Sequence, residues 1–109
     1  MKTKEECIRL INSCRQELQQ EYGIRSLRIF GSVARNEHTE TSDVDICIEA
    51  DPTGLIRFAH LKHFFENLLE CSVDLIRMNR NMDTFLKDQI ERDGIIVFES
   101  HYPSEIQLN

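Results

Sequence analysis

The sequence lacks a long hydrophobic run and an export signal. No apolar stretch approaches the roughly 20 residues that are needed to cross a bilayer. Residues 1–6 lead into an amphipathic pattern and not into the apolar core of a signal peptide. We therefore expect a cytoplasmic protein that does not enter a membrane.

Paired cysteines are also missing. The four cysteines, Cys7, Cys14, Cys47 and Cys71, form no C-x-x-C pair, so the pattern does not predict a zinc site. We expect their thiols to stay reduced and to pack as small apolar side chains.

Basic residues are in deficit, with 13 Lys and Arg against 19 Asp and Glu and a net charge of -6. Binding to polymeric nucleic acid rests on Lys and Arg side chains that neutralise phosphates. The balance therefore argues against a nucleic-acid polymer as partner, whereas a single nucleotide held through magnesium is compatible with it.

The chain shows no internal repeat, low-complexity segment or linker. Its 109 residues are enough for one compact domain with its own core. We expect a single domain over residues 1–109, with the core at about 5–99 and a C-terminal tail over 100–109.

Hydrophobic periodicity predicts alternating helices and strands. The expected strands are residues 26–30, 44–49, 72–76 and 95–98. The expected helices are residues 4–21, a short turn over 32–35, a helix starting at Asp51-Pro52, and a last helix marked by Met82, Phe85, Leu86 and Ile90. Gly23 should end the first helix, and Asn36 should leave the short turn in the left-handed conformation.

The helix after Asp51-Pro52 carries a broad apolar face. Asp51 is expected as its N-cap and Pro52 as its first residue. The apolar face consists of Leu55, Phe58, Leu61, Phe65, Leu68 and Leu69.

Two carboxylates share one face of the second strand, because side chains alternate along a strand. Val44, Ile46 and Ile48 lie on one face, and Asp43, Asp45 and Cys47 lie on the other. Neighbouring carboxylates are costly without a cation between them. Magnesium, which prefers oxygen ligands and phosphates, is the natural occupant.

A further carboxylate stands alone in the third strand. Val73 and Leu75 point one way and Asp74 points the other. If this strand neighbours the second, Asp74 joins Asp43 and Asp45 in one acidic cluster. Three carboxylates can hold two magnesium ions, which suits in-line phosphoryl or nucleotidyl transfer.

A glycine and a serine follow the first strand. Gly31 allows the backbone to approach a phosphate closely, and Ser32 opens a helical turn whose free N–H groups attract anions. Arg35 lies three residues on and either binds phosphate or braces the loop by pairing with an acid. Both readings of Arg35 stay open.

Together these residues resemble a known family. Gly31-Ser32, ten residues and then Asp43-x-Asp45 is similar to the signature of the DNA polymerase beta-like nucleotidyltransferase superfamily, and residues 31–35 and 42–46 look like its minimal (MNT) branch. The resemblance covers about residues 5–99. It implies an α/β (α+β) fold with a small mixed β-sheet of about four strands flanked by helices.

The resemblance also implies roles for the site residues. Asp43, Asp45 and Asp74 would bind Mg2+, with two ions expected, and Asp74 would help to activate the attacking hydroxyl. Gly31 and Ser32 would hold the β- and γ-phosphates of ATP. Asn36 stands where many relatives have Gly, and Asn can adopt the same backbone shape.

Members of this branch are often paired with a helical HEPN toxin, a ribonuclease, and some silence it by transferring AMP from ATP to a tyrosine. About ten residues follow the last expected strand, so we expect a partner to supply the acceptor site. The resemblance thus implies an antitoxin with adenylyltransferase activity, either as a homo-oligomer or in a hetero-oligomer with the toxin. The rivals are a binding module that neutralises its partner by contact and a nucleotidyltransferase that acts on a small molecule.

Other polar residues carry weaker signals. His60 and His63 are three residues apart on one helix but have no evident third metal ligand, so surface histidines are favoured. Arg77 and Arg80 are candidates for contacts with a triphosphate, with solvated loop charges as the favoured alternative.

Overall fold

The computed structural model describes residues 2–79 and 81–100. Its elements are α1 (Lys4–Ser13), α2 (Arg15–Glu21), β1 (Ile24–Phe30), α3 (Gly31–Ala34), β2 (Val44–Ala50), α4 (Leu55–Leu69), β3 (Val73–Arg77), α5 (Thr84–Asp93) and β4 (Ile95–Glu99). The expected mixed sheet of four strands flanked by helices is confirmed, and each strand lies within two residues of its expected bounds. Of the expected tail, only Ser100 lies within the described residues.

The strands are arranged in the order β3-β2-β1-β4. β1 is antiparallel to β2 and β4, whereas β2 and β3 are parallel. α4 joins β2 to β3, because parallel neighbours need a long crossover connection. The C-terminal end of β1 therefore lies beside the N-terminal ends of β2 and β3, and we call this the site end of the sheet.

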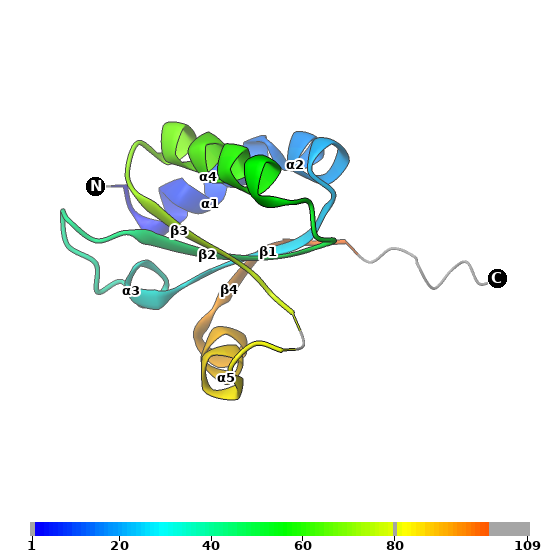
Figure 1. Cartoon of the computed structure of the whole chain (residues 1–109). Helices are drawn as coiled ribbons and strands as arrows, with labels where there is room; N and C mark the ends of the chain where they lie inside the picture. Colours follow the sequence, from blue (N-terminus) through cyan, green and yellow to red (C-terminus); the bar gives the residue numbers. More distant parts are fainter. Residues whose placement is uncertain (1, 80, 101–109) are drawn as a thin grey trace.

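Helices cover both faces of the sheet (Figure 1). α1, α2 and α4 lie on one face, α5 lies on the other, and α3 follows β1 at the site end. The main core lies between the sheet and the helices α1, α2 and α4. Its largest fully buried side chains are Ile11, Leu18, Ile24, Leu27, Ile29, Val33, Val44, Ile46, Phe65 and Leu69.

A second, smaller core lies under α5. Phe30, Cys47 and Ile90 are buried there, and Ile76, Met78, Met82 and Leu86 pack against them. Cys47 thus lies on the face opposite to Val44 and Ile46, as strand alternation predicts. Asp45 belongs to the same face as Cys47, so α5 borders the face that carries the candidate site.

The N-terminal helical segment is broken once. The prediction of one helix over 4–21 is wrong, because α1 ends before Cys14 and α2 begins after it. The Cys14 N–H donates to the carbonyl of Ile11, three residues back, at 3.0 Å, which tightens the chain locally. Leu18 remains buried, so the apolar stripe continues across the break. Gly23 follows the segment with a φ of +66°, as expected of a helix terminator.

The start of α4 differs from the prediction. Asp51 and Pro52 do not open the helix, which begins at Leu55 with Gly54 as N-cap at φ +87°. The Asp51 carboxylate instead pairs with Arg25 of β1 at 3.1 Å, so that it serves the sheet and not the helix. The apolar face expected from Leu55 starts later, because Leu55 is 86% exposed.

The last helix also buries fewer residues than expected. α5 begins after Asp83, whose side chain accepts a hydrogen bond from the N–H of Leu86. Met82 therefore precedes the helix. Phe85 is 72% exposed, because Leu86 and Ile90 occupy the side that faces the sheet.

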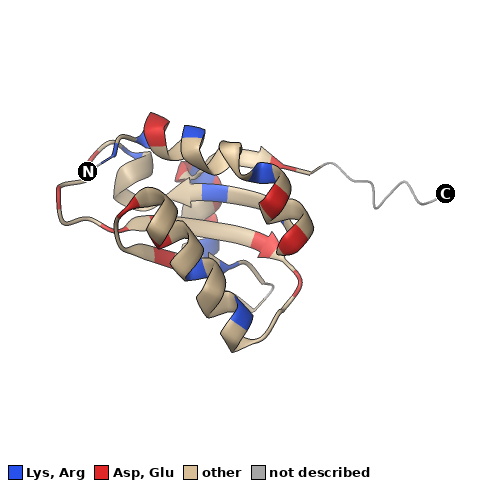
Figure 2. Ribbon diagram, turned by 90° about the horizontal axis from the view of Figure 1, so that it is seen from above, with Lys and Arg blue, Asp and Glu red and all other residues tan. Residues whose placement is uncertain are grey.

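All four cysteines carry free thiols, as expected, with Cys7 and Cys47 buried and the other two half-buried. Within residues 2–79 and 81–100, no helix has the length and apolar character to cross a membrane. Lys and Arg are interspersed with Asp and Glu over helices and strands alike (Figure 2).

Candidate active site

The site end of the sheet is built on the turn that follows β1. Phe30 ends the strand, and Gly31 turns the chain into α3 with a φ of +74°, a backbone conformation that glycine adopts without steric cost. Ser32 lies half-buried in this short helix. The predicted helical turn is therefore present at the position of the Gly-Ser pair.

Strand register brings two of the predicted carboxylates side by side. Asp45 of β2 pairs with Asp74 of β3 and, on its other side, with Phe30 of β1. Asp43 lies just before β2 and is exposed, as is Asp74, whereas Asp45 is half-buried. The condition for one acidic cluster, that β3 neighbours β2, is thus met.

The charges of this cluster act on its central member. Burial raises the pKa of the Asp45 carboxyl to about 6, the negative charges of Asp74 and Asp43 act in the same direction, and the positive charge of Arg35 opposes them. Deprotonated Asp45 is therefore unfavourable in the protein alone. A bound cation would remove this penalty.

This shift predicts how stability depends on pH. The pKa of Asp45 is about 6 in the folded chain and about 3.9 in an unfolded one. Between these values the folded state binds more protons, so the free energy of unfolding falls as pH rises through this window. Asp45→Asn has no carboxyl group to titrate at this position. The difference in free energy of unfolding between this variant and the parent should therefore grow, in favour of the variant, from pH 4 to pH 7. Urea denaturation of both proteins without divalent metal measures the difference; an advantage independent of pH would contradict it.

Gly31 and Asp45 are in direct steric contact. A Cβ atom added at Gly31 would overlap the Asp45 Oδ2 atom. The glycine therefore does two things: it supplies the positive φ of the turn, and it leaves room for the carboxylate. This close approach ties the phosphate-turn candidate to the metal-ligand candidate.

Arg35 braces the loop that follows the turn. Its Nε donates to Glu37 Oε1 at 2.9 Å, and the guanidinium acts electrostatically on Asp45. Asn36 takes a φ of +59°, so the expected left-handed exit is confirmed. The Glu37 N–H then donates to the carbonyl of Ser32 at 2.8 Å, which folds the loop back onto the turn. The bracing reading of Arg35 is thus realised, and its contact with phosphate stays a prediction.

The donor set fits a hard divalent cation by its chemistry. Carboxylate oxygens are the ligands that Mg2+ prefers, and Asp45 lies in the field of two further carboxylates. Within the described residues, no three His, Cys, Asp or Glu side chains stand together in a group that could hold a metal ion. Carboxylates without a cation between them repel one another. Their assignment as magnesium ligands stays a prediction.

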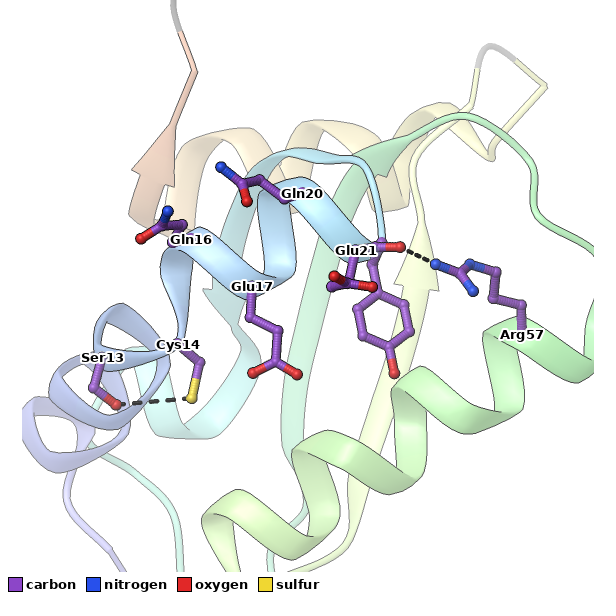
Figure 3. A pocket seen from close by; sticks show the side chains of 8 residues that line it. Ser13, Cys14, Gln16, Glu17, Gln20, Glu21 and Arg57 are labelled. Atoms are coloured by element: carbon purple, nitrogen blue, oxygen red, sulfur yellow. Dashed lines mark hydrogen bonds between the residues drawn. The ribbon is translucent and has the colours of Figure 1, made fainter.

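A cavity away from this site lies beside α2. A cavity of about 550 Å³ is lined by α1–α2 residues and by Arg57 of α4, including Ser13, Glu17, Glu21 and Tyr22 (Figure 3). The Arg57 guanidinium stacks on the Tyr22 ring, 5.0 Å from its centroid, and donates to the carbonyl of Glu21. These contacts tie α4 to the end of α2, so we read this cavity as a product of helix packing.

The weaker candidates, two histidines of α4 and one arginine of β3, contact other parts of the chain. His63 lies 3.6 Å from Glu66, and His60 lines a surface cavity beside Leu55. Arg77 Nη1 donates to the carbonyl of Ala50 at 3.4 Å, at the end of β3 opposite to the aspartates. The arginine at position 80 lies outside the described residues.

One residue that contacts the site region, Glu66, is not predicted by any pattern in the sequence. Glu66 Oε2 accepts a hydrogen bond from the Val73 N–H at 3.2 Å, one residue before Asp74. Glu66 occupies an ordinary charged position of an amphipathic helix. No spacing rule connects it with a strand seven residues later, so sequence reasoning had no signal for it.

Comparisons with known proteins agree with this geometry. Residues 12–102 match the family described as Polymerase beta, Nucleotidyltransferase. A Methanocaldococcus jannaschii protein named as a protein adenylyltransferase is 41% identical over 98 residues, which cover 89% of this chain and 100% of that protein. The protein adenylyltransferase MntA of Thermococcus cleftensis is 32% identical over 98 residues, covering 89% of this chain and 98% of the relative.

Solved structures share the fold. A structure named as a minimal nucleotidyltransferase superposes with a TM-score of 0.69 at 32% identity and covers 86% of this chain and 95% of its own. The structure of a tri-AMPylated Shewanella oneidensis HEPN toxin in complex with MNT antitoxin gives a TM-score of 0.65 at 19% identity, covering 90% of this chain and 74% of that one. With the paired aspartates and the Gly-Ser turn in place, the chain belongs to the polymerase beta nucleotidyltransferase family, in its minimal (MNT) branch.

Proposed function

We propose that this nucleotidyltransferase transfers AMP from ATP to a hydroxyl of a partner protein, a tyrosine of a HEPN-type toxin, and so acts as its antitoxin in the cytoplasm. The observation that carries the proposal is the register of Asp45 with Asp74 beside the Gly31 turn. Relatives named protein adenylyltransferase, and an MNT antitoxin structure that contains an AMPylated toxin, support the choice of donor and acceptor.

Asp43, Asp45 and Asp74 would hold magnesium, with two ions expected. When bound, the metal supplies positive charge that stabilises the developing negative charge on the phosphates. The raised pKa of Asp45 supports this role, because a cation at this position offsets the mutual repulsion of the carboxylates.

The chain's own residues would position the reactants and accept a proton. Gly31 and Ser32 hold the β- and γ-phosphates, and Arg35 lies beside them. The acceptor oxygen forms a bond to the α-phosphorus, the bond from that phosphorus to the bridging oxygen breaks, and pyrophosphate leaves. Asp74 takes the hydroxyl proton, since a tyrosine with a pKa of about 10 needs a base to attack at neutral pH.

We propose further that residues 1–109 act as one domain, with the partner contributing the acceptor. Every described element except α5 contributes residues to the main core. α5 covers the opposite face of the sheet, over the second core. Both Asp74 and Asp43 are exposed, so an incoming protein side chain has access to them.

Asp74→Ala tests this function. The variant should lose transfer by about 10²-fold or more, the usual scale for a general base, yet still bind Mg-ATP through Asp43 and Asp45 and still bind its partner. The measurement is intact mass of the partner after incubation with ATP and magnesium, beside rescue of cells that express the toxin. Asp51→Ala, which removes an exposed aspartate at the far end of β2, is the matched control.

The outcomes separate the rival functions. A mass gain of about one AMP unit or a small multiple with the parent, and none with Asp74→Ala, supports transfer to protein. Full rescue by Asp74→Ala without any mass gain on the partner would favour neutralisation by contact alone. Transfer by the parent only to a small molecule would replace the proposed acceptor.

A further inference from the structure

β3 is an edge strand, and it carries Asp74. Among the described strands, β2 alone pairs with it. The Ser72 carbonyl accepts from Val44 and the Met78 N–H donates to Ile48, so alternate residues of β3 face β2. Val73 has the other parity, and its N–H points away from the sheet. An outward N–H at the start of an edge strand has no strand partner to hold it.

Glu66 supplies that missing partner. Its Oε2 accepts from the Val73 N–H at 3.2 Å, in a partly buried contact from α4 to β3. The side chain is 25% exposed, and Lys62 and His63, one turn earlier on α4, each lie 3.6 Å from one of its carboxylate oxygens. Contacts from the preceding turn of α4 thus accompany the hydrogen bond that Glu66 accepts from β3.

We propose that Glu66 is a positioning residue for nucleotidyl transfer. Val73 pairs with Val44, and the next pair in the register is Asp45 with Asp74. A bond that fixes the Val73 backbone therefore fixes the backbone directly before Asp74. The inference rests on the proposed role of Asp74 and adds the element that holds this aspartate in place on an otherwise open edge.

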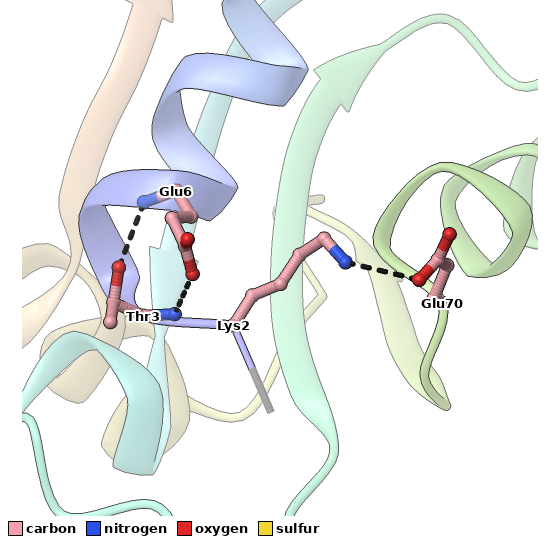
Figure 4. A network of polar contacts seen from close by, with 4 residues as sticks. All are labelled: Lys2, Thr3, Glu6 and Glu70. Atoms are coloured by element: carbon pink, nitrogen blue, oxygen red, sulfur yellow. Dashed lines mark hydrogen bonds and ion pairs between the residues drawn. The ribbon is translucent and has the colours of Figure 1, made fainter.

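A neighbouring glutamate offers a matched control. Glu70, one turn later at the end of α4, pairs with Lys2 at 3.3 Å, beside the capping box that Thr3 and Glu6 form at the start of α1 (Figure 4). This ion pair ties α1 to α4 on the protein surface and does not involve β3. Glu70→Gln thus removes a carboxylate near the same turn without touching the strand that carries Asp74.

The test compares Glu66→Ala with Glu66→Gln. Glu66→Ala should lower kcat by about 10- to 100-fold, the usual cost of removing a group that orients a metal-ligating side chain, with the KM for Mg-ATP within about threefold of the parent. Gln keeps an acceptor oxygen, so Glu66→Gln should restore kcat to within about threefold. Glu70→Gln should leave both constants unchanged. Parental kcat in Glu66→Ala, or equal loss in Glu66→Gln, would overturn the proposal.

A second readout does not depend on activity. Amide hydrogen exchange of Val73 in the protein without nucleotide should accelerate in Glu66→Ala and stay slow in Glu66→Gln, because only the former loses the acceptor. Unchanged exchange in Glu66→Ala would overturn the inference even if activity fell. Absence of transfer by the parent would instead count against the proposed function, so the two failures are distinguishable.

Discussion

Replacing Asp43 and Asp45 together by asparagine is expected to abolish nucleotide transfer while the fold persists. Removal of a single positioned charge-stabilising group costs about 10²–10³ in rate, so loss of the two proposed metal ligands should lower transfer by at least about 10³-fold. Asparagine preserves side-chain shape, and neither aspartate makes up part of the buried apolar core. Measurement of AMP transfer with the purified variant, beside its circular dichroism spectrum, separates lost chemistry from lost structure.

The same variant should be more stable than the parent in the absence of divalent metal. The pKa of Asp45 is raised by burial and by the charges of Asp74 and Asp43, and asparagine removes this unfavourable charge. Added magnesium should raise the melting temperature of the parent and not that of the double variant. Undiminished transfer by the folded double variant would disprove the assignment of these residues.

Gly31→Ala is expected to impair ATP binding far more than folding. The new Cβ would overlap Asp45 Oδ2, so that either the turn or the carboxylate must move. A displacement of about 1 Å at a reacting site can lower the reaction rate by about 10²-fold. Isothermal titration with Mg-ATP should therefore show affinity reduced by at least about tenfold, and AMP transfer should fall with it.

Gly23→Ala is the matched control for this prediction. Gly23 has a φ of +66°, close to the +74° of Gly31, but a Cβ at Gly23 meets nothing within 4 Å. Both variants carry the cost of alanine at positive φ, about 1–2 kcal/mol, and only Gly31→Ala adds the collision. Gly31→Ala should therefore lose more stability than Gly23→Ala, and only Gly31→Ala should lose ATP affinity. Equal ATP affinity in the two variants would mean that the phosphates bind away from Gly31.

The exposed apolar residues raise a separate question of contact surfaces. Leu55 and Ile56 lie at the start of α4, at the end of β2 opposite to Asp45, whereas Phe85 lies on α5, which borders the site face. A protein that presents a hydroxyl to Asp74 must approach this site face. Substitution of Phe85 would therefore bear more directly on partner binding than substitution of Leu55.

Much of the fold and part of the site follow from the sequence, because the relevant forces act within a few residues. Apolar runs mark the strands, and the two-residue period of a strand places Asp45 opposite to Ile46 wherever that strand goes. Positive φ at Gly23 and Asn36 follows from their small steric cost in that conformation. The family signature then joins Gly31-Ser32 to the aspartates.

Only the tertiary structure decided which residues become neighbours. The parallel pairing of β2 with β3, which puts Asp74 beside Asp45, depends on α4 crossing the sheet and not on either strand alone. Likewise, a side chain at position 31 would clash only because the Asp45 carboxylate lies against Gly31. Asp51, predicted as a helix cap from its neighbours in sequence, instead pairs with Arg25, which lies 26 residues earlier in the chain. Local patterns specify the helices and strands, but long-range packing decides which of them are in contact. The hydrogen bond from the Val73 N–H to Glu66 is the clearest example.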